Sequence, residues 1–186
     1  MPRGSRIQWL IGRLAACNRL TAESGRWLAA LLLCLMLVTV MMQVIFRYLL
    51  NDSLIWTEEI AKSMMVWAAF LVAPFAWRRG SNVAITMLVD PLAPRASASI
   101  RLLINGFVLW MLAVFLQASF GFVSRGLAIN AASLEVPMAV FYAIVPVSLG
   151  AMILVGCELL LRDVMTLLDP QGSYAIAAIA PIREGE

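Results

Sequence analysis

Two adjacent acids, a lysine and a tryptophan lie close together in one short stretch of this chain. Glu58 and Glu59 stand side by side, Lys62 follows one helical turn later, and Trp56 precedes them. Lys62 is four residues from Glu58 and three from Glu59, so on a helix it can pair with either carboxylate. Because neighbouring side chains on a helix point about 100° apart, we expect only one acid to face Lys62 and the other to face a partner.

The same cluster has a simpler interpretation, in which it only terminates and anchors a membrane helix. Acids near the start of a helix are favoured by the positive end of its dipole, and tryptophan is common at membrane interfaces. Both interpretations stay open at this point. A direct substrate or ion site is less favoured, since transporter sites concentrate near the bilayer midplane and not at the rim.

Other reactive side chains are few. The chain has no histidine and only three cysteines, which are far apart at positions 17, 34 and 157. No Cys-x-x-Cys pair is present, so a membrane thiol oxidoreductase is excluded. Without histidine or a cluster of acids inside an apolar run, the usual ligands of metals and haem are missing as well. We therefore expect no cofactor, no metal and no enzymatic activity.

The elements that carry these residues must lie in a membrane. Of the 186 residues, 62% are hydrophobic and 13% are charged, whereas a soluble domain is about half apolar and about a quarter charged. The apolar residues form four runs of about 20 residues, the length at which a helix crosses a bilayer. Barrel strands would instead alternate apolar and polar residues. The expected spans are residues 27–46, 55–77, 102–124 and 136–157.

This pattern predicts an all-α integral membrane protein with four transmembrane helices, divided into three parts. Residues 1–25 form a head whose apolar residues have the helical spacing that is typical of an amphipathic helix lying in the membrane interface. Residues 26–161 form the four-helix membrane domain, and residues 162–186 form a tail. The apolar residues of the head are Ile7, Leu10, Ile11 and Leu14.

The basic residues indicate how the chain is oriented. Lys and Arg in short flanking segments accumulate on the cytoplasmic side of a membrane. Eleven of the 14 lie in the head, in the connection between spans two and three, or in the tail, and the other three are Arg47, Lys62 and Arg125. With an even number of spans, we expect both termini in the cytoplasm. The basic charge then reflects topology, and no nucleic-acid partner is expected.

A small four-span drug exporter is one alternative for such a chain. That function needs a carboxylate inside the membrane, because a desolvated acid can exchange a proton for a substrate. We expect no acid inside the first, third or fourth span, and the second span has its acids near one end only. The chain is therefore not expected to transport a solute by itself.

Two arginines follow the second span, at Arg78 and Arg79, and Gly80 comes next. We expect these three residues to end the helix at the cytoplasmic face. Arginines at this position are ordinary membrane anchors. As a functional alternative, they could hold an anionic lipid headgroup or a loop of a partner protein.

Three motifs, in order along the chain, resemble a known family. They are Gln43-Val44-Ile45-Phe46-Arg47-Tyr48 at the end of the first span, Trp56-Thr57-Glu58-Glu59 at the second, and Arg79-Gly80-x-x-Val83-x-Ile85 after it. Together with the four spans and Pro146 in the last span, they resemble the small membrane subunit of tripartite ATP-independent periplasmic (TRAP) transporters. The match is best from Val44 to Asp90.

The resemblance implies a bacterial inner-membrane complex that imports organic acids by symport with sodium and uses a periplasmic substrate-binding protein. In that family the large membrane subunit carries the transport sites, so this chain is expected to be a scaffold that contacts the large subunit and membrane phospholipids. A self-contained small secondary transporter and a membrane adaptor unrelated to transport remain alternatives. The candidate contact residues are Trp56, Glu58, Glu59, Lys62, Arg78 and Arg79.

Overall fold

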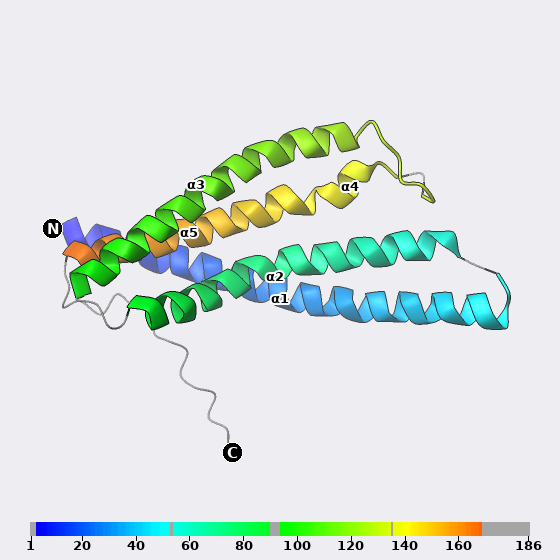
Figure 1. Ribbon diagram of the computed structural model, residues 1–186, viewed down its shortest axis with the longest axis horizontal. Helices are drawn as coiled ribbons and strands as arrows, with labels where there is room; N and C mark the ends of the chain where they lie inside the picture. Colours follow the sequence, from blue (N-terminus) through cyan, green and yellow to red (C-terminus); the bar gives the residue numbers. More distant parts are fainter. Residues whose placement is uncertain (1–2, 53, 90–93, 135, 169–186) are drawn as a thin grey trace, which may run out of the picture.

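Helices make up nearly all of the described chain (Figure 1). The computed structural model describes residues 3–52, 54–89, 94–134 and 136–168. The expected all-α fold is confirmed over these residues. The helices, in chain order, are α1 (Arg3–Leu49), α2 (Ile55–Val89), α3 (Pro94–Gly126), α4 (Met138–Tyr142) and α5 (Ile144–Leu168).

Four segments of these helices are long and apolar enough to cross a membrane. Each overlaps one of the four runs expected from the sequence, and the fourth consists of α4 followed by α5. Many large apolar side chains on them point outward, which suits a lipid environment and not water. The four-span prediction is therefore confirmed. The segments are Gly12–Leu49, Ile55–Arg79, Ser99–Gly126 and Met138–Met165.

The long helices are arranged as two pairs (Figure 1). α1 packs mainly on α2, and α3 packs mainly on α5. The pairs come together at the end where α1 begins and α5 ends, and they diverge toward the opposite end. We call this opposite end the loop end, because the connections 50–54 and 127–137 lie there. The half of the molecule toward the other end, where α1 begins and α5 ends, is called the arginine end. It is named after Arg26, which lies at the middle of α1, and after Arg78, Arg79, Arg101 and Arg162.

α1 runs without a break from the head into the first span. The boundary expected after residue 25 therefore does not coincide with the end of a helix. Gly25 lies inside α1 where this helix crosses α2, and a Cβ atom there would lie only 2.7 Å from the carbonyl oxygen of Leu71. The glycine thus serves a close helix crossing and not a turn. The side chains of residues 1–11, which include most of the expected amphipathic face, lie outside the described part.

α2 is longer than expected, and the prediction that Arg78, Arg79 and Gly80 end it is wrong. The helix continues through these residues to Val89. A single glycine inside a helix costs only about 1 kcal/mol relative to alanine, and it removes no backbone hydrogen bond. Its last described residue, Val89, lies two residues before Pro91 in the sequence.

The fourth span is interrupted near its start. α4 ends at Tyr142 and α5 begins at Ile144, with Ala143 between them at φ −59° and ψ −25°. Pro146 explains the interruption, because it has no N–H group to donate to the carbonyl oxygen of residue 142. α5 then continues to Leu168, so the first seven residues of the expected tail are helical. Residues 169–186 lie outside the described part.

Candidate functional site

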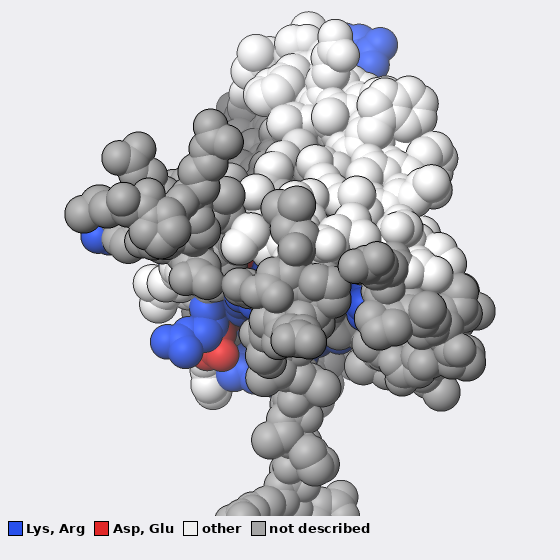
Figure 2. Space-filling model, turned by 90° about the vertical axis from the view of Figure 1, so that its left-hand side faces the viewer, with Lys and Arg blue, Asp and Glu red and all other residues white. Residues whose placement is uncertain are grey.

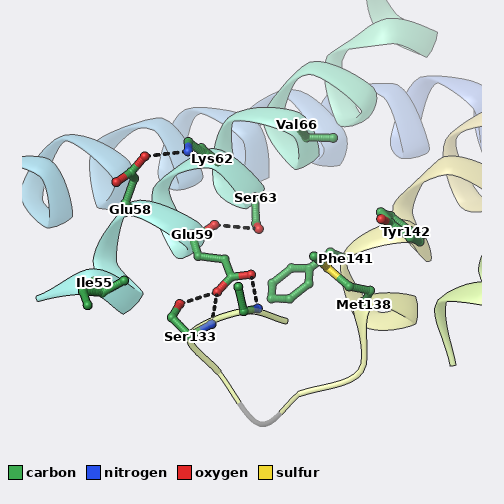
Figure 3. Close-up of a pocket in the computed structure, with 11 residues that line it drawn as sticks. Ile55, Glu58, Glu59, Lys62, Ser63, Val66, Ser133, Met138, Phe141 and Tyr142 are labelled. Carbon is green, nitrogen blue, oxygen red and sulfur yellow. Dashed lines mark hydrogen bonds and ion pairs between the residues drawn. The ribbon is translucent and has the colours of Figure 1, made fainter. Parts of the chain in front are cut away.

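Glu58 and Glu59 have different partners at the loop end (Figure 3). Glu58 forms an ion pair with Lys62, with 2.6 Å between Oε1 and Nζ, and the two side chains are 59% and 73% exposed. Glu59 turns toward the connection between α3 and α4. Its carboxylate accepts the backbone N–H groups of Ala132 at 3.1 Å and Ser133 at 3.0 Å, and also the Ser133 hydroxyl group.

This geometry separates the roles of the two acids. The Glu58–Lys62 pair is exposed, and an exposed pair of this kind contributes little to stability, so both charges are accessible to a partner. Glu59 instead links α2 to the connection 127–137 and so joins the two helix pairs at the loop end. As the spacing suggested, only one acid pairs with Lys62, and the contact of the other is within this chain. Trp56 is 38% exposed beside them.

A cavity of about 470 Å³ opens beside Glu59, between α2, the connection 127–137 and α4 (Figure 3). Its size falls within the usual range of small-ligand sites, about 300–1,000 Å³. The acids that contribute to its lining are already engaged by Lys62 and by the loop. The cavity therefore suits an apolar side chain or an acyl chain better than an ionic solute. Its apolar lining residues are Ile55, Val66, Met138, Phe141 and Tyr142.

Two further hydrogen bonds hold α2 against the fourth span. Nε1 of Trp67 donates to the carbonyl oxygen of Phe141 at 3.1 Å, and the hydroxyl group of Ser148 donates to the carbonyl oxygen of Phe70 at 2.6 Å. Phe141 lies next to the helix interruption and lines the cavity. These bonds therefore fix the position of α4, which forms one wall of the cavity, relative to α2.

A buried carboxylate joins three helices at the arginine end. Glu158 on α5 is fully buried. It accepts hydrogen bonds from Asn18 of α1 at 2.8 Å and from Arg78 of α2 at 3.2 Å. A third donor, Arg162, lies one turn further along α5 at 2.9 Å. Figure 2 looks onto this end, where basic side chains and an acidic side chain are visible at the surface, whereas the fully buried Glu158 is not.

The run expected as the fourth span, residues 136–157, contains no acid, and Glu158 directly follows it. The apolar helical segment continues past Glu158 to Met165, and two guanidinium groups compensate the buried charge, which is the condition for burying a carboxylate at all. The four-residue spacing of Glu158 and Arg162 is a sequence signal that could have indicated an ion pair. The other donors lie 140 and 80 residues away along the chain, so only the fold brings them to Glu158.

The six expected contact residues fall into two groups at opposite ends of the membrane part of α2. Residues 56–62 lie at the loop end, and the two arginines lie at the arginine end. The arginines differ from each other. Arg78 is directed inward to Glu158, whereas Arg79 is exposed and its guanidinium carbon lies 4.7 Å from the centre of the Phe75 ring. The structure thus brings together the loop-end group but separates it from both arginines.

The polar residues of α3 also differ in their contacts. Asn105 donates to Asp163 of α5 at 2.6 Å and so helps to pack these two helices. The Ser119 hydroxyl group donates within its own helix. Gln117 is exposed and has no hydrogen-bond partner among the described residues. An amide in an apolar span favours a hydrogen-bonding neighbour on another helix, so Gln117 is a further candidate contact residue.

Comparison with known proteins identifies a family and several relatives. Residues 35–166 match the family model described as "Tripartite ATP-independent periplasmic transporters, DctQ component". A protein of Haemophilus influenzae with the provisional name TRAP transporter small permease protein is 33% identical over 78 residues. The matched part covers 42% of this chain and 48% of that protein.

Two further relatives carry more specific names. The sialic acid TRAP transporter small permease protein SiaQ of Vibrio cholerae is 32% identical over 71 residues, which are 38% of this chain and 41% of that protein. The isethionate TRAP transporter permease protein DctMQ of Oleidesulfovibrio alaskensis is 26% identical over 118 residues, which are 59% of this chain but 19% of that protein. The matched part of the chain thus spans about half of the length of these relatives or less.

Proposed function

This chain belongs to the DctQ family of tripartite ATP-independent periplasmic (TRAP) transporter components, and we propose that it is the small membrane subunit that braces the large membrane subunit. The complex imports an organic acid across the bacterial inner membrane, driven by a sodium gradient and supplied by a periplasmic binding protein. The arginine end faces the cytoplasm, an orientation supported by the excess of Lys and Arg in the segments on that side.

The observation that carries the scaffold role is that three acids, two on α2 and one on α5, are already engaged by the chain itself. Glu58 pairs with Lys62, Glu59 accepts the amides of the loop, and Glu158 accepts donors from three helices. A transporter coupled to a cation needs oxygen ligands that can take up and release the ion near the midplane. Because Glu59 and Glu158 link helices to each other and Glu58 is paired at the rim, we place the transport sites in the large subunit.

The class of solute is proposed from the relatives. Their names include isethionate and sialic acid, both of which are organic acids. This supports an organic acid as the solute of the complex that contains this chain. The scaffold role means that the choice of a particular acid is made by the large subunit and the binding protein.

Docking on the large subunit is proposed to use two exposed features. The first is the loop-end group of Trp56 with the accessible Glu58–Lys62 pair. The second is Gln117 on α3, since hydrogen bonds between membrane helices are worth about 1 to 2 kcal/mol in model peptides. The DctMQ relative, in which the matched part is 19% of a longer protein, supports a small subunit that lies beside its large partner.

Affinity capture tests the docking proposal. The full-length chain carries a tag, is coexpressed with the large membrane subunit of the same organism and is captured in mild detergent. We expect the large subunit to co-purify, and recovery to fall for Glu58→Gln combined with Glu59→Gln and also for Gln117→Leu. Glu23→Gln, which alters an exposed acid on α1, is the matched control and leaves recovery unchanged. If the double variant recovers as much of the large subunit as the wild type does, both acids serve only to anchor the helix.

Solute uptake tests the scaffold role separately. Proteoliposomes that contain this chain alone are expected to take up none of a panel of radiolabelled organic acids under a sodium gradient. Robust uptake by the chain alone would refute the scaffold role and favour a self-contained transporter. Repeated capture of the chain without any large membrane protein would favour an adaptor unrelated to transport.

A further inference from the structure

Two arginines from different helices meet at one aromatic ring at the arginine end. The guanidinium carbon of Arg26 on α1 lies 5.3 Å from the centre of the Phe75 ring on α2, and that of Arg79 lies 4.7 Å from the same centre. Arg26 also lies 5.3 Å from the centre of the Trp27 ring. These distances are within the range of cation–π contacts, about 6 Å. Two positive charges from different helices thus contact one ring.

The packing of α1 on α2 fixes this arrangement. Gly25 directly precedes Arg26, and a Cβ atom at Gly25 would meet the carbonyl oxygen of Leu71 at 2.7 Å. The two helix backbones therefore cross in close contact one residue before Arg26 and one turn before Phe75. The backbone positions of Arg26 and Phe75 therefore follow from a close helix crossing, and Arg79 lies one turn beyond Phe75 on the same helix.

The charges of Arg26 and Arg79 are not balanced within the described part of the chain. Neither guanidinium group forms an ion pair with a described carboxylate, whereas the neighbouring Arg78 is paired with the buried Glu158. Glu23 lies one turn before Arg26 on α1 but makes no ion pair with it. Since like charges repel each other, two guanidinium groups beside one ring favour an anion that binds to both.

We propose that Arg26 and Arg79 together bind the phosphate group of an anionic phospholipid, with Phe75 and Trp27 in contact with the apolar part of the lipid. A guanidinium group presents two parallel N–H donors to phosphate oxygens, and basic residues near the cytoplasmic surface attract anionic headgroups. The lipid contact expected from the sequence at Arg78 and Arg79 thus moves to Arg26 and Arg79, because Arg78 is directed inward. This site does not depend on the transporter role.

Lipid titration of the purified full-length chain in detergent tests this site, with binding followed by native mass spectrometry. The probes are phosphatidylglycerol, phosphatidylcholine with the same acyl chains, and inorganic phosphate. We expect phosphatidylglycerol to bind more tightly than phosphatidylcholine. Inorganic phosphate at the same concentration should not displace it, because it lacks the apolar contacts with the two rings. Displacement would overturn the lipid site in favour of a site for free phosphate.

Two double variants with the same loss of charge give the matched comparison. Arg26→Gln with Arg79→Gln should weaken phosphatidylglycerol binding by about 30-fold, from the usual contribution of each basic residue near a charged surface. Arg47→Gln with Arg125→Gln removes two positive charges near the loop end and should leave binding unchanged. An equal loss in both double variants, or no loss in the first, would overturn the proposal.

A lysine variant keeps the test decisive if the glutamine variant does not fold. Arg26→Lys with Arg79→Lys retains both charges but loses the paired N–H donors of the guanidinium groups. A clear loss of phosphatidylglycerol affinity in this variant, with helical content unchanged by circular dichroism, supports the site. Full wild-type affinity would overturn the recognition of phosphate by the two guanidinium groups.

Discussion

Glu158→Gln removes the charge from the buried junction of α1, α2 and α5 and keeps the shape of the side chain. The wild-type carboxylate accepts N–H donors from Asn18, Arg78 and Arg162 at 2.8 to 3.2 Å. Removal of one partner from a buried ion pair costs about 3 to 5 kcal/mol, because the remaining charge stays buried without compensation. Glutamine still offers one acceptor oxygen, so we expect a loss near the lower limit, about 3 kcal/mol.

The assay is thermal unfolding of the purified full-length chain in mild detergent, followed by circular dichroism. In a chain of this length, 1 kcal/mol corresponds to about 2 to 4 °C, so the Tm of the variant should fall by about 6 to 12 °C. Glu23→Gln is the control, because Glu23 is exposed and unpaired among the described residues, and its Tm should match the wild type.

A double-mutant cycle distinguishes the junction from a general loss of stability. Arg78→Gln alone should also destabilise the chain, because it leaves Glu158 with one guanidinium partner fewer. The combined variant should lose less than the sum of the two single changes, since each removes the same ion pair. A change of less than about 2 °C for Glu158→Gln, or strict additivity of the pair, would refute this account of the arginine end.

Three further outcomes are expected. Glu59→Gln should speed hydrogen exchange at the backbone amides of Ala132 and Ser133, which donate to the Glu59 carboxylate. Glu58→Gln should leave the exchange of these amides unchanged. Equal exchange rates in the two variants would exclude the proposed link between the helix pairs. Gly25→Ala should cost about 1 to 3 kcal/mol by forcing α1 away from α2, while Gly106→Ala, with no atom within 4 Å of the added Cβ, should not lower the Tm. Trp67→Phe should lower the free energy of unfolding by about 1 kcal/mol through loss of one hydrogen bond, measured by denaturant titration.

The membrane spans could be predicted because a bilayer imposes a length on an apolar helix. The runs at 55–77 and 102–124 lie within the observed segments Ile55–Arg79 and Ser99–Gly126. The ends of the helices were harder to predict. Gly80 is a common helix terminator, but in α2 no further signal accompanies it until Pro91. The weak tendency of Gly80 to end a helix therefore did not prevent α2 from continuing to Val89.

The loop-end cluster was found from the sequence because its members are close along the chain. The spacing of Glu58, Glu59 and Lys62 correctly limited the lysine to one acid. The spacing could not indicate that Glu59 reaches Ser133, because that contact joins segments 74 residues apart. Nor could local spacing show that Glu158 meets donors on α1 and α2. Contacts of this kind depend on how the helices pair, which a single sequence of apolar runs does not specify.

The length of α1 has a mechanical consequence. A helix of 47 residues is about 70 Å long, and a tilt of 40°, the upper end of the usual range, still leaves about 54 Å along the membrane normal. The hydrocarbon layer is about 30 Å thick, so a stiff arm of this helix must project beyond it. A sideways force on the projecting arm would therefore act first on the contacts that tie α1 to α5, the hydrogen bonds from Asn18 to Leu154 and Glu158.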